Sequence, residues 1–469
     1  MANRFYNRLL ASSKNLSVTS NEYEERESRL LRETVHNAYA NAKFWRDWMD
    51  RAKIKPHEIC SVKDLSRIPL SSKEDLMSRP LRERLAADPQ KCVRMSTSGT
   101  TGEPMEVYYS RRFVLSTGRM LRARHQSMLG LGRMYKWLQI SYSAPDEDSL
   151  ASTNSKPRSA DSPEIGTDED PRARRKRTLG LGTSIVGPLV DRFLRTVYIS
   201  RDIEPVISKI LKFAPDLVSG NSYYLKLLSW YIEKHRVPFR PAALLSTGGP
   251  LDEPSRKFLE SKIPCPTYQM YGSSEIGPVA LECRSKRGMH IFADRVIVEV
   301  LSMNGEHCEP GELGEIVVTG LSNHAMPLIR YRMRDIGSLS SEQKCECGNS
   351  LPKLASVEGR EIDHIVTPDG RLISPKKIMT LVHQTDGLPR CQLVQSSPDS
   401  LTLRIFAEKT NACSDGSIER FFEVLRRLIG SPLNLRVSLE DEAKIGAKLR
   451  PIVRTFSVSD ESLAKLYVA

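Results

Sequence analysis

Short strands and helices alternate through the middle of this 469-residue chain, and no other feature restricts its fold as strongly. Runs of four or five apolar residues, typical of buried strands, are separated by segments with the apolar spacing of helices. The predicted elements, in chain order, are a strand at 137–143, a helix at 203–213, a strand at 216–219, a helix at 223–235, a strand at 243–247 and a helix at 253–261. Such alternation predicts an α/β fold with helices on the faces of a parallel sheet.

Other parts of the chain show different patterns. Residues 22–52 have the apolar spacing of one amphipathic helix that packs on the core. Residues 296–301 and 315–319 alternate apolar and polar residues, which predicts an antiparallel, barrel-like subdomain. Strands at 401–407 and 435–438 around a helix at 418–428 predict a compact α+β module. We therefore expect an N-terminal domain at 1–357 and a C-terminal domain at 358–469.

Small hydroxyl residues and glycines form an unusual run, Ser96-Thr97-Ser98-Gly99-Thr100-Thr101-Gly102-Glu103-Pro104. Glycines allow a ligand to approach the backbone closely, and free N–H groups with Ser and Thr hydroxyls can surround phosphate oxygens. The run is not the P-loop of nucleotide triphosphatases, since the chain has no G-x-x-x-x-G-K-[ST] string. On its own, the run is also compatible with a polar surface loop.

Four further motifs follow along the chain. They are Tyr271-Gly272-Ser273-Ser274-Glu275, Tyr331-Arg332-Met333-Arg334-Asp335, Gly359-Arg360-Glu361-Ile362-Asp363 and Gly446-Ala447-Lys448-Leu449-Arg450. Together with the hydroxyl-rich run, this set resembles the adenylate-forming superfamily of acyl-CoA ligases, adenylation domains and luciferases. Within it, the chain is most similar to the phenylacetate-CoA ligases and their capsular-polysaccharide-associated relatives. The sequence at 363–375 is especially similar to that of the capsular-polysaccharide-associated relatives.

The resemblance implies an ATP-dependent carboxylic acid ligase. In that family the acid attacks the α-phosphorus of ATP, pyrophosphate leaves, and an acyl- or aryl-adenylate forms before transfer to coenzyme A. Because two anions must meet, Mg²⁺, a lysine and backbone N–H groups have to converge on the phosphates. The sequence leaves two alternatives open: transfer to an amine, hydroxyl or carrier-protein thiol in natural-product or envelope biosynthesis, and an inactive zinc-stabilised binding module.

The phosphate-binding residues implied by the resemblance come from the hydroxyl-rich run. They are Thr97, Ser98, Gly99, Thr100, Thr101 and Gly102, with Thr100 counted among the catalytic residues. Lys448 matches the family's catalytic lysine, whose ammonium bridges the attacking carboxylate and the α-phosphate. A lysine in a C-terminal loop is ordinarily just solvated, so this role comes from the motif alone.

The nucleoside-binding residues implied by the resemblance come from the other motifs. Tyr271, followed by Gly272 and Ser274, would stack on adenine, and Glu275 would bind Mg²⁺, since hard cations prefer carboxylate oxygen. The loop at Gly248 and Gly249 would lie against adenine at a strand end, where open α/β sheets bind ligands. Asp335 would accept hydrogen bonds from both ribose hydroxyls. Arg360 would contact ribose or phosphate at the hinge before a mobile lid domain.

Several positions depart from the family pattern. Residues 103–105 lack the positive charge that many relatives carry there, and Pro250 replaces a frequent acidic residue. Arg334 stands where glycine is usual, and Ile362 takes the usual hinge position. These changes indicate a specialised branch.

A structural metal site is predicted from Cys283, His290, Cys345 and Cys347. Two thiolates on a glycine-containing turn suit tetrahedral zinc, and the capsule-related branch has a similar arrangement. Buried free cysteines are the plain alternative, and His307 with Cys308 is the second choice of ligands.

Composition limits the classes of partner. The net charge is +13, but the basic residues are dispersed and not interleaved with aromatics, so a nucleic-acid partner is not expected. Nine irregularly spaced cysteines argue against a disulfide framework. Without an apolar run of membrane length or a secretion signal, we expect a cytoplasmic enzyme. The resemblance also allows a homodimer. Residues 146–177 read as a disordered insertion, because they are poor in large apolar residues.

Overall fold

The structure is a computed structural model that describes residues 20–96, 104–142, 193–199, 203–302, 304–342, 344–385, 387–388, 391–406, 416–430, 432–440 and 450–456. The predicted insertion at 146–177 lies outside these residues. No helix in these ranges combines the length and apolarity that a membrane span needs.

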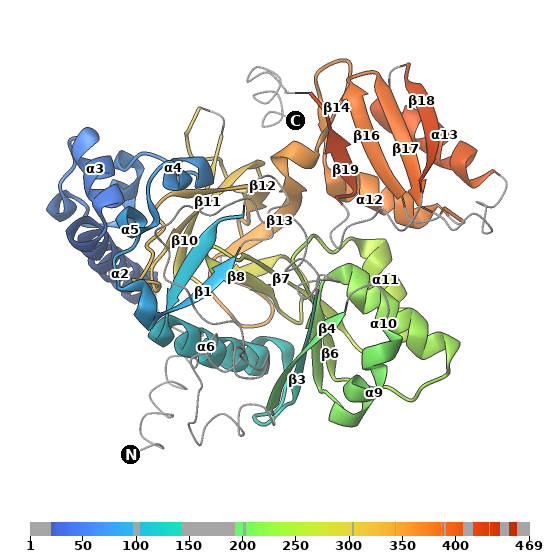
Figure 1. The fold of residues 1–469 in the computed structure, drawn as a ribbon, viewed down its shortest axis with the longest axis horizontal. Coiled ribbons are helices and arrows are strands. Elements are labelled where there is room, and N and C mark those ends of the chain that lie inside the picture. The colour runs from blue at the N-terminus through green and yellow to red at the C-terminus, as the bar shows by residue number, and fades with distance from the viewer. Residues whose placement is uncertain are drawn as a thin grey trace, which may run out of the picture.

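One large sheet runs through the described part of the chain up to Arg360 (Figure 1). It has 11 strands in the order β10-β11-β12-β13-β9-β8-β7-β6-β5-β3-β4. Their bounds are β3 Trp137–Tyr142, β4 Leu194–Ile199, β5 Leu217–Gly220, β6 Ala243–Thr247, β7 Thr267–Ser273, β8 Gly277–Glu282, β9 Met289–Ile291, β10 Val296–Leu301, β11 Gly314–Gly320, β12 Tyr331–Leu339 and β13 Lys353–Arg360.

The half of the sheet from β4 to β7 is parallel, as the alternation of strands and helices predicts. The helices α9 (Glu204–Phe213), α10 (Ser222–Lys234) and α11 (Glu253–Lys262) lie on one side of these strands, and α6 (Arg111–Leu129) lies on the other (Figure 1). Asn221 caps α10 and Asp252 caps α11 through side-chain oxygens that accept backbone N–H bonds. Asn221 directly follows β5, and Asp252 follows the short loop after β6, so each helix begins close to a strand end.

The other half of the sheet, from β7 to β10, is antiparallel. The antiparallel strands predicted at 296–301 and 315–319 correspond to β10 and β11. They continue the same ladder as the parallel strands, so the change from parallel to antiparallel pairing falls at β7. Tyr271, on that strand, thus lies where the two halves of the sheet meet.

The structure corrects the prediction of a single N-terminal helix. Residues 22–52 form two helices, α2 (Ser20–Asn41) and α3 (Lys43–Arg51), because Ala42 takes an extended conformation between them. The break lets Trp45 turn inward, where it is fully buried and donates from Nε1 to the carbonyl of Pro327 at 2.8 Å. As predicted, the apolar stripe of these helices packs on the core.

Short elements connect these helices to the sheet. They are η2 (Pro56–Glu58), η3 (Val62–Arg67), α4 (Lys73–Met77), α5 (Leu81–Arg84), η4 (Pro89–Lys91), β1 (Cys92–Ser96) and β2 (Glu106–Ser110). β1 and β2 pair antiparallel, with Ser96 opposite Glu106. The two ends of the hydroxyl-rich run are therefore held side by side.

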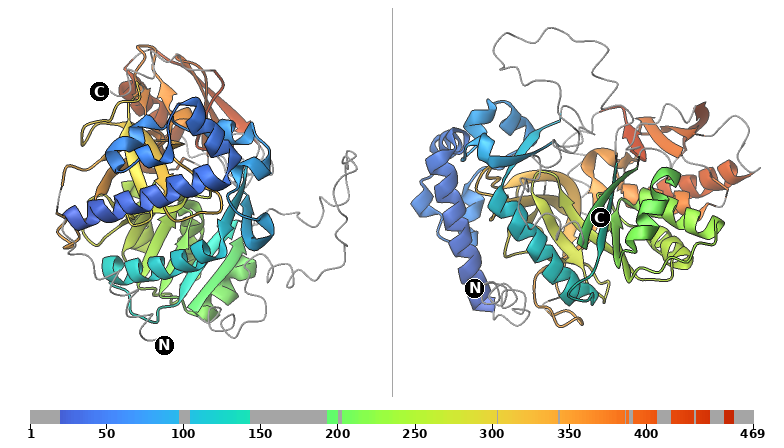
Figure 2. Two further views of the ribbon diagram at one scale, coloured as in Figure 1. Left: turned by 90° about the vertical axis from the view of Figure 1, so that its left-hand side faces the viewer. Right: turned by 60° about the horizontal axis from the view of Figure 1, so that its bottom comes forward.

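The residues after Arg360 build a separate small sheet, which Figure 2 shows beside the larger one. Its order is β18-β17-β16-β19, with a two-stranded ladder, β14-β15, before it. The elements are η5 (Glu361–Asp363), β14 (Ile365–Val366), β15 (Leu372–Ile373), α12 (Pro375–Gln384), β16 (Cys391–Ser397), β17 (Ser400–Phe406), α13 (Ser417–Ile429), β18 (Asn434–Glu440) and β19 (Ile452–Arg454). Their buried residues form a core cluster of their own. β13 continues to Arg360, three residues beyond the expected domain boundary, which itself stays a prediction.

Candidate functional site

A glycine turn leaves the carboxyl end of β6 at Gly248 and Gly249. Gly248 has a φ of +74°, a conformation that side chains disfavour. Two side chains from the neighbouring strands hold the turn: Asn221 Nδ2, just after β5, donates to the Gly248 carbonyl at 3.3 Å, and Gln269 Nε2, within β7, donates to the Gly249 carbonyl at 3.5 Å. The sequence analysis did not select Asn221 or Gln269. The position of Asn221 directly after a buried strand was the available signal.

Tyr271 and Asp335 meet although 64 residues separate them. The Tyr271 hydroxyl donates to Asp335 Oδ2 at 2.8 Å. Desolvation by the surrounding protein raises the pKa of Asp335 to about 6, against the lowering effects of the Tyr271 hydrogen bond and the Arg360 charge. Burial, followed by the Asp335 charge, raises the pKa of Tyr271 well above its usual value. At pH 7 the pair is therefore a neutral phenol bound to a carboxylate.

Arg360 is the residue opposite Asp335 in the β12–β13 ladder. Its positive charge lowers the pKa of both Asp335 and Tyr271, so it stabilises the ionised carboxylate. The next residue along the chain begins η5, and the small sheet follows. Arg360 thus stands between the nucleoside-binding candidates and the C-terminal region.

The turn after Tyr271 is tightly packed. A Cβ atom at Gly272 would lie 2.4 Å from the Gly277 carbonyl oxygen and 2.9 Å from Pro278 Cα, so only glycine fits. Ser273 Oγ accepts from the backbone N–H groups of Glu275 and Ile276, at 3.2 and 3.3 Å. These bonds fix the backbone that carries the Glu275 carboxylate.

Ser274 receives a contact that the sequence analysis missed. The Tyr109 hydroxyl donates to the Ser274 carbonyl, and the Tyr109 ring stacks on Phe113 with centroids 4.7 Å apart. The nearby Glu275 charge adds to the effect of burial in raising the pKa of both Tyr109 and Tyr271. Glu275 therefore lies close to both rings.

The other predicted phosphate-binding and catalytic residues lie outside the described residues. They are Thr97, Ser98, Gly99, Thr100, Thr101, Gly102 and Lys448. Their roles stay predictions, and the structure describes only the residues that flank them, such as Ser96 and Arg450.

Two of the departures from the family pattern have clear local structures. Arg334 has a φ of +59°, a conformation that is costly for a residue with a side chain and is natural for glycine, the residue expected there from the resemblance. Its guanidinium lies between Glu74 at 3.7 Å and Glu361 at 4.0 Å. Ile362, the next departure, is exposed.

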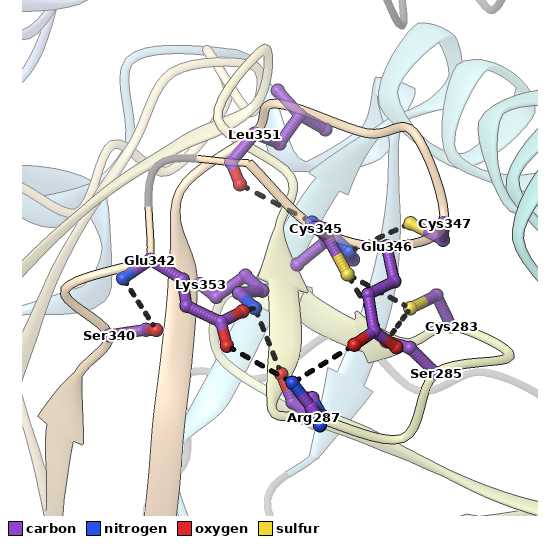
Figure 3. Close-up of polar contacts among 11 residues, drawn as sticks. Cys283, Ser285, Arg287, Ser340, Glu342, Cys345, Glu346, Cys347, Leu351 and Lys353 are labelled. Carbon is purple, nitrogen blue, oxygen red and sulfur yellow. Dashed lines mark hydrogen bonds and ion pairs between the residues drawn. The ribbon is translucent and has the colours of Figure 1, made fainter.

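Four predicted metal ligands come together at the far end of β12 and β13. Figure 3 shows the three cysteines among them. The ligand atoms of Cys283, His290, Cys345 and Cys347 all lie within 4.8 Å of one another. Cys283 Sγ lies 3.7 Å from Cys345 Sγ, and Cys347 Sγ lies 3.3 Å from His290 Nε2. Bonds of about 2.3 Å to a tetrahedral metal place sulfur atoms about 3.8 Å apart, so these distances fit one metal ion.

The surroundings of His290 suit a metal ligand. Its Nδ1 lies 3.3 Å from the Leu351 carbonyl, which directs Nε2 toward the three sulfur atoms. Burial lowers the pKa of His290 to about 4, so the imidazole is neutral, as coordination requires. The alternative ligands are not assembled: His307 is exposed, and Cys308 Sγ lies 3.6 Å from the Leu313 carbonyl.

Several known proteins are similar to this chain over most of its length. No family model matches the chain. The chain is 26% identical over 346 residues to a phenylacetate-coenzyme A ligase from Pseudomonas putida, covering 72% of this chain and 70% of the relative. It is 27% identical over 379 residues to a ligase of the same name from Thermus thermophilus, covering 79% and 77%. It is also 19% identical over 400 residues to Protein CapK from Staphylococcus aureus, covering 83% and 81%.

The fold of the chain is also similar to that of a coenzyme A ligase. The crystal structure of a 2-hydroxyisobutyryl-CoA ligase in its postadenylation state has a TM-score of 0.70 and 17% identity, covering 93% of this chain and 90% of that chain. In sequence and in fold, the chain is similar to members of the adenylate-forming superfamily. The superfamily resemblance stated from the motifs is therefore confirmed.

Proposed function

We propose that this protein is an ATP-dependent carboxylic acid ligase that forms an acyl- or aryl-adenylate and transfers the acyl group to coenzyme A. The observation that carries the proposal is the grouping of Tyr271, Asp335 and Arg360 around one hydrogen bond and one strand pair. An aromatic ring, a carboxylate and a guanidinium together offer what adenine, ribose and phosphate need. Two of the sequence relatives and the structural relative named above are coenzyme A ligases, which supports this assignment.

Asp335 is assigned to the ribose. A carboxylate has two oxygens with several lone pairs, so it can keep the Tyr271 hydrogen bond and still accept from a ribose hydroxyl. Tyr271 and the turn at Gly248 and Gly249 are assigned to adenine. The hydrogen bonds from Asn221 and Gln269 support this assignment, because they fix the turn before any ligand arrives.

The phosphate chemistry is assigned to Glu275, the hydroxyl-rich run and Lys448. Glu275 would bind Mg²⁺, which would offset the negative charge of the phosphates. Residues Thr97 to Gly102 would donate to the β- and γ-phosphates, and Lys448 would stabilise charge at the α-phosphorus. Ser96, the first residue of the run, pairs with Glu106, two residues beyond its end, and this pairing supports the role of the run.

We also propose that Cys283, His290, Cys345 and Cys347 bind zinc. Three thiol sulfurs and one imidazole at these separations suit this metal, and four protein ligands leave no open position for catalysis. The ion would hold the β8–β9 hairpin to the loop between β12 and β13.

The C-terminal region is assigned to a lid that begins after Arg360. A separate sheet and core cluster support this division. In this arrangement Arg360 belongs to the nucleotide site and to the hinge at once.

Pyrophosphate release tests the function. The full-length protein is incubated with ATP and Mg²⁺ and a panel of aryl, fatty and amino acids, each with and without coenzyme A. Release that depends on one acid and accelerates with coenzyme A supports the proposal. Release that coenzyme A does not change points to another acceptor, and a protein that binds ATP but releases no pyrophosphate with any acid contradicts the ligase assignment.

A further inference from the structure

One histidine of the C-terminal region contacts the large domain far from the chain connection. His383 is the penultimate residue of α12, and its Nδ1 lies 2.6 Å from Asp252 Oδ2 and 3.2 Å from Ser255 Oγ. Its Nε2 lies 2.9 Å from Lys226 Nζ. Asp252 and Ser255 belong to the start of α11, and Lys226 belongs to α10. One imidazole therefore joins three helices.

The protonation of this group follows from its donors and acceptors. A neutral imidazole has one N–H donor and one nitrogen acceptor. The Nδ1–H donates to the Asp252 carboxylate, and Nε2 accepts from the Lys226 ammonium. Asp252 is buried, so its charge depends on such partners. Hydrogen bonds from His383 and Ser255 keep its pKa below the usual value, although burial acts in the opposite direction.

The two ends of α12 contact different parts of the large domain. At its N-terminal end, the cap residue Ser374 donates to Glu358 of β13 at 3.0 Å, close to Arg360. At its C-terminal end, His383 contacts α10 and α11. A helix of ten residues spans about 15 Å, so a rotation near Arg360 displaces His383 much more than Ser374. A large rotation of the C-terminal region about this point would separate His383 from α10 and α11.

The superfamily comparison shows which arrangement these contacts accompany. The hydroxyisobutyryl ligase in its postadenylation state matches this chain with a TM-score of 0.70. The same ligase in its thioesterification state matches with a TM-score of 0.58, at 17% identity and covering 93% of this chain and 91% of that chain. The overall arrangement of this chain is thus nearer to the postadenylation state.

We propose that His383 is a positioning residue that holds α12 against α10 and α11 and so favours adenylate formation over thioester formation. The proposal rests on the ligase function proposed above. Its basis is the pair of hydrogen bonds that His383 forms with Asp252 and Lys226. These bonds join the lid region to the large domain away from the hinge, where a large rotation would break them.

Separate assays of the two half-reactions test this role in the full-length protein. Acid-dependent exchange of pyrophosphate into ATP reports adenylation, and thioester formation from added acyl-adenylate and coenzyme A reports the second step. His383→Ala is expected to slow exchange by about tenfold, the effect of losing one hydrogen bond to a charged group, while the second step stays equal or becomes faster. An equal loss in both half-reactions would overturn the proposal.

Three further variants separate positioning from general damage. His383→Gln keeps one donor and one acceptor and should restore most of the exchange rate. Asp252→Asn keeps an oxygen to cap α11 but removes the charge, and should act like His383→Ala without additional loss in the double variant. Gln384→Ala, at the exposed neighbouring position on α12, should behave as wild type. A Gln384→Ala effect equal to that of His383→Ala contradicts the proposal.

Hydrogen exchange keeps the proposal testable if the ligase function itself fails. His383→Ala should increase amide exchange at the C-terminal turn of α12 and the first turn of α11, and Gln384→Ala should not. If the wild-type protein releases no pyrophosphate with any acid, the proposed ligase function is wrong, but the hydrogen-exchange test of His383 still applies. Unchanged amide hydrogen exchange at these two turns in His383→Ala would contradict the positioning role.

Discussion

Arg450 and Asp363 form an ion pair between the end of the described C-terminal sheet and the turn that follows Arg360. Arg450 donates from Nε to Asp363 Oδ1 at 2.9 Å, and Nη2 contacts the same oxygen. Burial raises the pKa of Asp363, while the Arg450 charge opposes this rise. The pair links the turn beside the hinge to the residue two positions after Lys448, the predicted catalytic lysine.

Removing Arg450 should destabilise the C-terminal region. Arg450→Ala leaves a largely buried carboxylate without its cation, and we expect a loss of about 2 kcal/mol in the free energy of unfolding. Urea denaturation measures it. Arg436→Ala, at an exposed position on β18 of the same sheet, is the matched control and should cost much less. Equal losses in both variants would contradict a role for the ion pair.

Nucleotide binding should weaken below pH 6. The pKa of Asp335 is raised to about 6, so its carboxylate is ionised above that pH and protonated below it. Since the ionised form is the better acceptor for ribose hydroxyls, AMP affinity should fall about tenfold per pH unit below 6. Calorimetric titration with AMP between pH 5 and pH 8 measures this, and Asp335→Asn should bind weakly at every pH.

Tyr271→Phe should shift the same pH profile. The Tyr271 hydrogen bond lowers the pKa of Asp335, so its loss raises that pKa and moves the midpoint to higher pH by on the order of one unit. The Phe ring can still stack on adenine, so affinity at pH 8 should change little. A midpoint that stays in place or moves to lower pH would show that the hydrogen bond does not control Asp335.

Removing a cysteine of the metal cluster should lower stability and metal content together. We expect about one zinc ion per chain in the wild-type protein, and much less in Cys345→Ser with a melting temperature at least about 5 °C lower. Cys60→Ser, at an exposed cysteine outside the cluster, is the control. Metal analysis and thermal denaturation decide the matter, and wild-type protein without zinc would refute the metal assignment.

Gly272→Ala should damage the turn that carries Glu275. The new methyl group would lie 2.4 Å from the Gly277 carbonyl oxygen, so the backbone must shift, at a cost of roughly 1–3 kcal/mol. Pyrophosphate release should fall as well. Gly132→Ala, with no atom within 4 Å of the added Cβ, should have no comparable effect on unfolding or activity.

Much of the fold could be predicted from local patterns. The strand at 243–247 has the predicted bounds, and the helix at 203–213 differs only because Ile203 is its cap. The break at Ala42 could not be predicted, since alanine favours helix and the cause is the burial of Trp45 against a distant segment.

The candidate site, too, could be predicted only in part from the sequence. Motifs placed Tyr271, Asp335 and Arg360 in one site, because a family resemblance carries long-range information. The contact between His383 and Asp252 spans 131 residues without any motif, so no local signal could find it. Tyr109 and Gln269 are ordinary strand residues in the sequence, and only the folded sheet shows what they hold.

The Cys/His cluster and the Asp335–Arg360 pair lie toward opposite ends of one hairpin, formed by β12 and β13. Between them the ladder contains two irregularities in pairing. Because side chains alternate faces along a strand, a slip of one residue would turn Asp335 away from Tyr271. A cluster that fixes the closed end of the hairpin therefore sets the register at its open end. Loss of the cluster would therefore displace Asp335 relative to a bound nucleotide even if the chain stays folded.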